Sequence, residues 1–407
     1  MAVLDLVALG AVLKQKYNQR EFYEIGYTKN PTWSMIRKAT DFGGDNKVVA
    51  LRYGMVQGTS PVFADAQSTA TPSSYARVTV TRVRDYVVAY IDGEAISAAQ
   101  KDADSLIKAF SKEIDSAMAR ATRNNAIKFE GNGGGALGQA TFSTTTATLV
   151  DANGVSAPYL ATNFEKGMTL ESSTADGTSG AITSTSTVQI VAVNRVAGTL
   201  TGNVSFTGAG FANSDYLFVK GSFGRCMAGY PAWIPSTVPT AGSSFFGLDR
   251  SVDTRLYGWQ INGNGGPIEE TLIECLSVLN REGAETDLIT LNPLDWSNLV
   301  KAQQSRVIYD RVKSMSDPEV GFQSVKVIGP QGPVDVISDL NQPKGRYKAM
   351  QLDTWSFESS GPAPRILAED GISPILRSPN ADSYEVRIGW YGNAICEAPG
   401  LNGGGTL

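Results

Sequence analysis

The stretch RVTVTRVRDYVVAYIDGEAISAAQKDADSLIKAFSKEIDSAMARATRNNAIKFE, residues 77–130, decides the fold, because a strand-like segment runs directly into a long helix-like one. The second part predicts one uninterrupted amphipathic helix over residues 92–130, with Asp92 as its N-cap and Gly131 as its stop. Its apolar residues recur at steps of three or four, the period of one helix face. They are Ile96, Ala99, Ala103, Leu106, Phe110, Ile114, Ala117 and Ala121. At about 1.5 Å per residue the helix would extend on the order of 50 Å and span a domain.

The segment before the helix predicts a two-armed β-ribbon, with arms at residues 47–57 and 77–91 that are rich in β-branched and aromatic residues. The link between them, GTSPVFADAQSTATPSSYA, is too polar to pack a core. Because an isolated hairpin is at best marginally stable in water, the ribbon is expected to lean on a neighbouring subunit. A hairpin folded over its own domain is the alternative.

Composition limits the chemistry. The 407 residues suffice for two or three domains, and a hydrophobic content of 42% allows sizeable cores. The chain has no histidine, which excludes Ser-His-Asp and Cys-His catalysis and histidine-bearing zinc sites. Cys226, Cys275 and Cys396 lie far apart without CxxC spacing, so we expect buried free thiols in a reducing compartment.

The N-terminus and the charge narrow the class of protein further. Asp5 interrupts the first apolar stretch and no cationic region precedes it, so no signal peptide is predicted, and no apolar run is long enough for a membrane span. Leu6, Leu9, Leu13 and Tyr17 favour an amphipathic helical arm instead. A net charge of -5 argues against a dedicated nucleic-acid binder but not against a container for nucleic acid.

A change of composition begins at about Gln139. From there to about Gly221 charges thin out, Ser, Thr and Gly increase, and the strand-like runs TATLV, GMTLES, STVQIVAVNR, GTLTGNVSF and YLFVKG alternate with turns. GNGGG before this segment and GSFG after it are flexible crossing points, so we expect a small inserted β-domain. A single sheet continuous with the rest is the alternative. Residues 173–187 are expected to form an exposed, mobile loop.

After this segment the chain is mixed α and β. Pro267 followed by IEETLIECLSVLNRE predicts a short helix, and Glu269 and Glu270 are interpreted as residues of its first turn rather than as a catalytic pair. DLITLNPLDWSNLVKAQ predicts a buried strand, a turn at Asn292 and Pro293, and another helix. Strands are expected in FQSVKVI, GPVDVIS, RYKAMQLDTW and YEVRIGWYGNAICEA.

In this order, the features resemble the major capsid proteins of tailed bacteriophages with the HK97-type fold. The stretches that carry the resemblance are GTSPVFADA at 58–66, DGEAI at 92–96, GYPAWIP at 229–235, ITLNPLDWSNL at 289–299 and RIGWYGNAICEAPG at 387–400. None is a strict motif, but their order and spacing cover nearly the whole chain.

The resemblance implies an α+β, HK97-like capsid fold with an N-terminal arm, a β-ribbon called the E-loop, a P-domain with a long spine helix, and an A-domain, plus an inserted small β-barrel-like domain. The expected parts are the arm (1–45), the E-loop (46–91), the spine helix (92–138), the inserted β-domain (139–222), the P-domain return with a second helix (223–283), the A-domain (284–372) and a C-terminal P-domain strand (373–407).

The function implied is that of a major capsid protein whose copies self-assemble into pentamers and hexamers, forming the icosahedral head around packaged double-stranded DNA. The expected partners are further copies of the chain, a separate scaffolding protein and a portal, with a decoration protein as a candidate. The DNA would be enclosed without sequence-specific binding. No enzyme activity, catalytic residue, cofactor, metal or membrane is expected, and the location would be the virion capsid, assembled in the host cytoplasm.

The E-loop and spine helix are the expected contacts between subunits. The interface residues hypothesised are Arg52, Thr59, Ser60, Pro61, Phe63, Arg82, Arg84, Asp85, Lys101, Lys108, Asp115 and Arg120. Single surface ion pairs contribute only about 0 to 1 kcal/mol each, so cohesion must come from many repeated contacts. Some relatives cross-link a Lys of the E-loop to an Asn of a neighbour, but the ribbon's only lysine, Lys47, lies at its base, so no such bond is predicted.

Other classes of protein fit less well. A β-rich tail or adhesin protein would suit the Thr-rich segment but not the long helix, and a cellular nanocompartment of the same fold is disfavoured by the added β-domain and the length. A hydrolase or transferase using Asp and Glu alone shows no readable constellation. GNGGG lacks the GxxxxGK[ST] pattern and follows a helix instead of opening one, so we interpret it as a linker and not as a phosphate loop.

Overall fold

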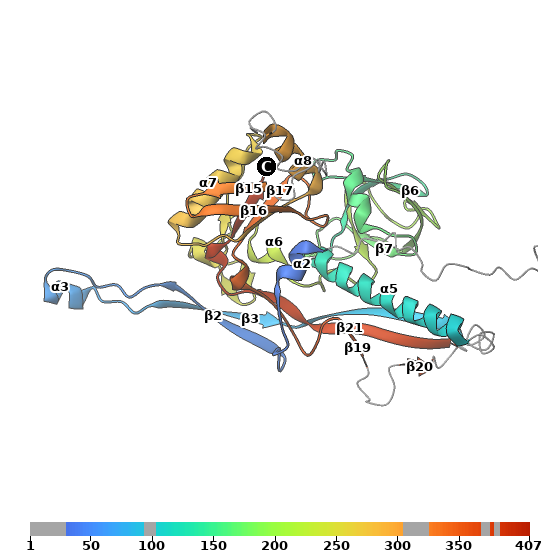
Figure 1. Ribbon diagram of the computed structural model, residues 1–407, viewed down its shortest axis with the longest axis horizontal. Helices are drawn as coiled ribbons and strands as arrows, with labels where there is room; N and C mark the ends of the chain where they lie inside the picture. The colour runs from blue at the N-terminus through green and yellow to red at the C-terminus, as the bar shows by residue number, and fades with distance from the viewer. Residues whose placement is uncertain (1–29, 93–102, 304–324, 368–374, 378–382) are drawn as a thin grey trace, which may run out of the picture.

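The computed structural model describes residues 30–92, 103–303, 325–367, 375–377 and 383–407 (Figure 1). The predicted N-terminal helical arm and residues 93–102 of the predicted long helix lie outside these residues. Asp92, predicted as the N-cap of that helix, is the last residue of a strand. Within them, two six-stranded sheets, a closed barrel, a protruding ribbon and a small two-stranded sheet make up the β-structure. The chain is therefore mixed α and β, as the sequence predicts.

The first sheet is built around the long strand β21 (Ser383–Cys396). One edge of β21 pairs with β4 (Val83–Asp92). Its other edge pairs with β18 (Trp355–Ser359), β19 (Arg365–Ile366) and β20 (Ile375–Arg377), and β1 (Arg37–Ala39) extends the sheet beyond β18.

The long helix α5 (Ala103–Phe129) lies across this sheet (Figure 1). Ala117 and Ala121 are buried against Ala89, Val386 and Ile388 of β4 and β21. Their small side chains let the helix backbone approach the strands closely. The expected apolar helix face is thus confirmed at these two alanines, and the helix ends two residues before Gly131, where the sequence places its stop.

The ribbon is shorter than predicted. Strand β2 (Asn46–Gly54) pairs with β3 (Ser74–Thr81), and one further bridge joins Gln57 to Thr71, whereas β4, expected in the same arm as β3, pairs with β21. Alternation of side chains identifies a strand but not its partner, so one apolar run was interpreted as one arm although Arg82 divides it into two strands. The link contains a short helix that the sequence did not predict, α3 (Phe63–Ser68).

The barrel closes in the strand order β10-β5-β6-β9-β8-β7. Its elements are β5 (Gly138–Phe142), β6 (Thr146–Val150), η2 (Pro158–Asn163), β7 (Thr169–Ser173), β8 (Val188–Asn194), β9 (Thr199–Gly202) and β10 (Asp215–Val219). The five predicted runs are confirmed as strands, and Phe164, Phe206, Leu170 and Leu217 fill the interior. The connections into and out of the barrel lie side by side, because the Gly224 N–H donates to the Gly134 carbonyl at 2.9 Å.

The loop of residues 173–187 is more tightly held than expected. Gly177 is buried, and the Asn132 amide donates to Asp176 Oδ2 at 2.7 Å. The loop therefore packs at its start against the GNGGG run. Thr178, Ser179 and Gly180, which follow Gly177, are exposed, as predicted for the loop.

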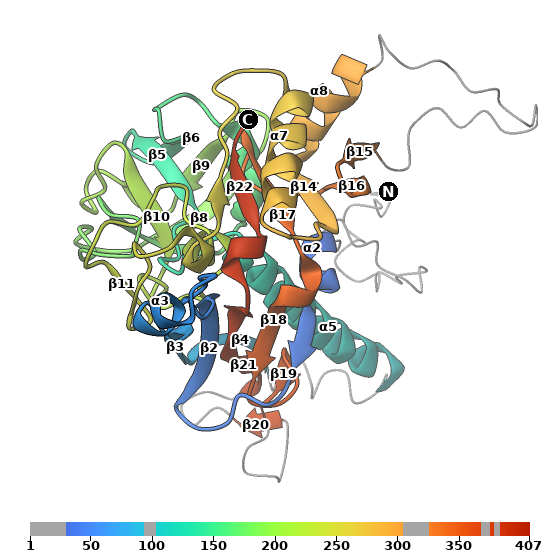
Figure 2. The same cartoon turned by 90° about the vertical axis from the view of Figure 1, so that its left-hand side faces the viewer.

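The second sheet has the order β13-β22-β17-β14-β16-β15. These strands are β13 (Trp259–Gln260), β14 (Leu288–Leu291), β15 (Val325–Gly329), β16 (Gly332–Ser338), β17 (Arg346–Met350) and β22 (Gly403–Thr406), and α7 (Ile268–Arg281) and α8 (Pro293–Gln303) pack against them (Figure 2). The predicted helices and the strands in FQSVKVI and GPVDVIS are confirmed within the described residues. The stretch RYKAMQLDTW, predicted as one strand, is strand only to Met350 and continues as the 3-10 helix Leu352–Thr354. Strand β22 was not predicted because its glycines have low strand propensity. Glycine is needed at Gly405 because a Cβ there would lie 1.9 Å from the Ile261 carbonyl oxygen.

Short elements complete the chain: α2 (Pro31–Met35), α6 (Tyr230–Trp233), β11 (Ser244–Phe245), β12 (Leu248–Asp249), η3 (Thr254–Leu256), η4 (Leu352–Thr354) and η5 (Pro399–Leu401). An aromatic core ties α2 to the end of α5 and to the first sheet, with Phe129 between Trp33 (centroids 6.1 Å apart) and Trp355 (5.5 Å). The three cysteines are buried free thiols, as predicted, and burial raises the pKa of Cys275 and Cys396 to about 12.

Candidate assembly surfaces

The ribbon has an anchored base and a free tip. At the base, Leu51, Val78 and Val80 are buried in the main core, and the Thr79 N–H donates to the Phe246 carbonyl at 3.0 Å. Beyond Gly54 the chain leaves the body, and Figure 1 shows α3 at the far end of the ribbon. The alternative interpretation, a hairpin folded over its own domain, thus holds for the base, whereas contact of the tip with a neighbouring subunit stays a prediction.

The tip carries apolar side chains in water. Met55 is 72% exposed, Val56 64%, Val62 53% and Phe63 80%, and no residue of α3 is buried. Exposed large apolar side chains close together are typical of surfaces at which proteins contact other molecules. Of the residues hypothesised from sequence, Thr59, Ser60, Pro61 and Phe63 all lie in this tip.

The remaining hypothesised residues lie in different environments. Arg52, Arg82, Arg84 and Asp115 are exposed. Asp85 and Arg120 are engaged within the chain, with Lys128 Nζ 2.7 Å from Asp85 Oδ1 and Arg120 Nη1 3.0 Å from Glu165 Oε2. Lys101 lies outside the described residues, and Lys108 belongs to the part of α5 whose side chains are not described.

Lys47 lies at the base of the ribbon, where the sequence places it. Its ammonium group is 2.9 Å from Asp41 Oδ2 and 2.6 Å from Glu358 Oε2. Glu358 is buried, so this pair fixes the ribbon to the first sheet. The Lys47 hydrogen bond also lowers the pKa of the Asp41 carboxyl group.

A second exposed apolar surface lies on β4, on the face turned away from α5. Tyr86, Val88 and Tyr90 alternate along the strand and are 47%, 39% and 61% exposed. These three residues are not among those hypothesised from sequence. The signal that could have found them is that β4 is apolar at both alternating sets of positions, although a helix covers only one face.

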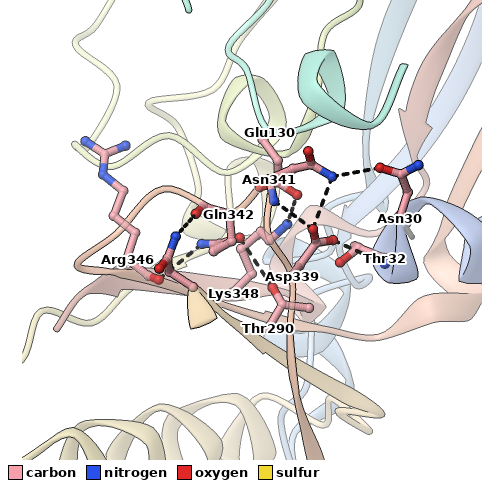
Figure 3. A network of polar contacts seen from close by, with 10 residues as sticks. Asn30, Thr32, Glu130, Thr290, Asp339, Asn341, Gln342, Arg346 and Lys348 are labelled. Carbon is pink, nitrogen blue, oxygen red and sulfur yellow. Dashed lines mark hydrogen bonds and ion pairs between the residues drawn. The ribbon is translucent and has the colours of Figure 1, made fainter. Parts of the chain in front are cut away.

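A buried polar junction joins the end of α5 to the second sheet (Figure 3). Lys348 of β17 forms an ion pair with Glu130, directly after α5, and the side chains of both are almost wholly buried. The Lys348 ammonium also lies 5.5 Å from the Phe129 ring centroid and 5.4 Å from that of Tyr230. Burial raises the pKa of Glu130, and the positive charge of Lys348 opposes this shift.

The turn after β16 extends this junction toward the N-terminal segment (Figure 3). Asp339 Oδ2 accepts from the Thr32 N–H at 3.3 Å, and the Asn341 amide donates to Asn30 Oδ1 at 3.1 Å. Gln342 accepts from the Thr290 hydroxyl group at 3.4 Å. These bonds join three distant parts of the chain, so we interpret the cluster as structural.

Known proteins are similar to this chain in fold and not in sequence. No family model matches the chain, and no curated protein is similar to it in sequence. Among solved structures, the cyanophage A-1(L) capsid asymmetric unit superposes with a TM-score of 0.54 at 10% identity, covering 97% of this chain and 100% of that one. The chain has the fold of a phage capsid protein. The resemblance stated from the sequence is therefore confirmed at the level of fold.

Two further capsid structures are similar over most of their length. The capsid of a native GTA particle matches at 9% identity and a TM-score of 0.48, covering 99% of this chain and 98% of that one. The satellite phage P4 procapsid matches at 10% identity and a TM-score of 0.35, covering 92% and 93%. In the part of this capsid fold that the structure describes, no cluster of His, Cys, Asp and Glu could hold a metal ion, and no helix is long and apolar enough to cross a membrane.

Proposed function

We propose that the chain is the major capsid protein of a tailed bacteriophage, and that its copies form pentamers and hexamers in an icosahedral shell around double-stranded DNA. The observation that carries the proposal is the ribbon tip, an apolar surface held away from its own body. A protein that works alone gains nothing from such an exposed surface, whereas in a shell every copy can cover the tip of its neighbour.

We assign the parts of the HK97-type fold by matching each one to the sheets and helices of the chain. We take the ribbon of β2, α3 and β3 as the E-loop, α5 as the spine helix over the P-domain sheet, and the second sheet with α7 and α8 as the core of the A-domain. The barrel is assigned as the inserted domain, and its adjacent entry and exit support this assignment. In this proposal β13, α7 and β22 belong to the A-domain, and β4, β18 and β19 belong to the P-domain sheet. The boundaries expected from sequence therefore change within 46–91, 223–283, 284–372 and 373–407, and those of the arm and the inserted domain are kept.

The proposed contact joins the tip of one copy to the β4 surface of another. Phe63 and Val62 would pack against Tyr86, Val88 and Tyr90, which pairs two apolar surfaces that are otherwise in water. Fully burying a phenylalanine side chain contributes about 1.5–3 kcal/mol. One such contact is weak, but a closed shell repeats it in every subunit, together with contacts of exposed charges such as Arg52.

The remaining partners are proposed from the capsid assignment. A separate scaffolding protein and a portal would act during assembly in the host cytoplasm, and a decoration protein is a candidate for the barrel. The mature location would be the virion capsid. The proposed role is structural, without catalysis and without sequence-specific DNA binding.

The experiment that tests this function uses Phe63→Ser with Val196→Ser as its matched control. Val196 is 91% exposed on the barrel, so both variants remove an exposed apolar side chain. Both are expected to fold like the unchanged protein, as judged by circular dichroism and the urea midpoint. Only Phe63→Ser should weaken assembly, raising the concentration needed for particles by about tenfold, since a factor of ten corresponds to about 1.4 kcal/mol. Equal assembly of both variants would contradict the proposed role of the tip.

A further inference from the structure

A groove of about 910 Å³ lies between β4, the C-terminal half of α5 and the two connections of the barrel. The consecutive residues 82–87 all line it. Neighbouring side chains of a strand point to opposite faces of the sheet. A groove on one face would touch every second residue, so a groove lined by six consecutive residues runs along the edge of the strand. The groove therefore opens onto the edge of β4.

This edge of β4 has no partner among the described strands. The strand pairs with β21 from Val83 to Asp92, while β18, β19 and β20 occupy the far side of β21. In an antiparallel pair every second residue directs its N–H and C=O groups away from the partner. Those groups of β4 face outward, and such an edge is a ready template for an added strand.

Positive charge gathers around the same edge. Of the described residues that line the groove, six are arginine or lysine and two are aspartate, in a chain whose net charge is -5. Lys128 and Arg120 are neutralised by acidic partners. Arg82 is also exposed and donates a hydrogen bond to the Ser360 hydroxyl group at 3.4 Å. Arg84, Lys220 and Arg225 are exposed and form neither an ion pair nor a side-chain hydrogen bond with any described residue. Three free cations thus flank an unpaired strand edge.

One acceptor at the edge is also unsatisfied. Asp85 binds Lys128 through Oδ1, whereas its Oδ2 atom is buried and has no hydrogen-bond partner among the described residues. A ligand that supplies N–H donors would satisfy this oxygen as well as the outward carbonyl groups of β4. A nucleic-acid backbone offers phosphate oxygens and no comparable row of donors, so the edge favours a peptide.

We infer that this groove binds an acidic peptide segment of a partner protein, which adds to β4 as an extended strand and directs its carboxylates toward Arg84, Lys220 and Arg225. The added strand would cover the open edge of the first sheet and bridge it to the barrel connections. The inference does not depend on the proposed shell function, because it concerns a groove formed within one chain.

The test is fluorescence anisotropy with the purified full-length protein and a labelled acidic peptide, TEVEVEVEVT. We expect saturable binding that weakens with salt. The triple variant Arg84→Ser, Lys220→Ser and Arg225→Ser should bind at least tenfold more weakly. The control variant Arg77→Ser, Lys166→Ser and Lys301→Ser removes three exposed cations outside the groove and should bind like the unchanged protein.

A second peptide, TEVEPEVEVT, separates strand addition from simple charge attraction. It carries the same charge, but proline removes a backbone donor and disrupts a strand, so it should bind at least tenfold more weakly. Equal binding of both peptides, displacement by single-stranded oligonucleotide as effective as by unlabelled peptide, or no binding at low salt would each overturn the inference. Particle formation is measured separately, so failure here leaves the shell proposal intact.

Discussion

At the residue scale, the Glu130–Lys348 pair is the contact that the sequence could least predict. The two residues are 218 positions apart, and neither stands in a motif. Only the fold brings the end of α5 against β17. By contrast, the absence of histidine alone excludes catalysis by Ser-His-Asp or Cys-His groups. Phe63 was also placed correctly in the ribbon tip, because it lies in the link between the two predicted arms. Composition and local order are readable from sequence, whereas buried pairs depend on the tertiary arrangement.

Removal of one partner from this buried pair should destabilise the fold strongly. Lys348→Met leaves Glu130 buried without its counter-charge, and we expect the free energy of unfolding to fall by about 3–5 kcal/mol. The double variant Glu130→Leu with Lys348→Met should recover much of the loss. Urea unfolding followed by tryptophan fluorescence measures both effects. Lys326→Met, which breaks an exposed pair with Asp335, is the control and should cost only about 0 to 1 kcal/mol. Equal urea midpoints for the two single variants would refute this account.

At the element scale, periodicity predicted helices and strands well and their partners poorly. The helices α5, α7 and α8 and five barrel strands follow from local patterns of apolar residues and turns. The division between β3 and β4 does not, because pairing with β21 is a long-range choice. The six-residue helix α3 was missed in a link rich in Ser and Thr, and β22 was missed because close backbone packing selects its glycines against their propensity.

The docking of loop 173–187 against the GNGGG run depends on a glycine. Gly177 has φ +90°, and a Cβ there would lie 2.2 Å from the Gly134 carbonyl oxygen. Gly177→Ala should therefore detach the loop at a cost of about 1–3 kcal/mol, typical of overpacking. The measurement is the rate of limited proteolysis within the loop, which should increase.

Gly154→Ala is the matched control for this prediction. Gly154 also lies in the barrel and has φ +77°, but a Cβ there would meet nothing within 4 Å. Both variants carry similar backbone strain, so only the clash distinguishes them. If the two raised the cleavage rate within the loop equally, the contact with Gly134 would not be what holds it.

At the scale of the whole molecule, the resemblance to phage capsid proteins was stated from the order and spacing of sequence stretches, and the fold superposes on a solved capsid structure over 97% of this chain at 10% identity. The proposed assembly surfaces were predictable only in part, since which apolar side chains stay exposed depends on how the whole chain folds. Phe63 was hypothesised as an interface residue from sequence, whereas the exposure of Met55 and Val56 beside it is visible only in the structure.

Cohesion of the particle is expected to be non-covalent. Lys47 is held in ion pairs with Asp41 and Glu358 at the ribbon base, far from the tip that would contact a neighbour. Purified particles boiled in detergent should therefore run as a single band at the monomer mass on a denaturing gel. A ladder of covalent multimers that persists under reducing conditions would refute this prediction.

The measurement that tests the central claim most directly is negative-stain electron microscopy of the purified protein, with size-exclusion chromatography over a range of concentrations. The account predicts closed shells or rings of five and six subunits. A strict monomer at every concentration, including in the presence of a scaffolding protein, would contradict it.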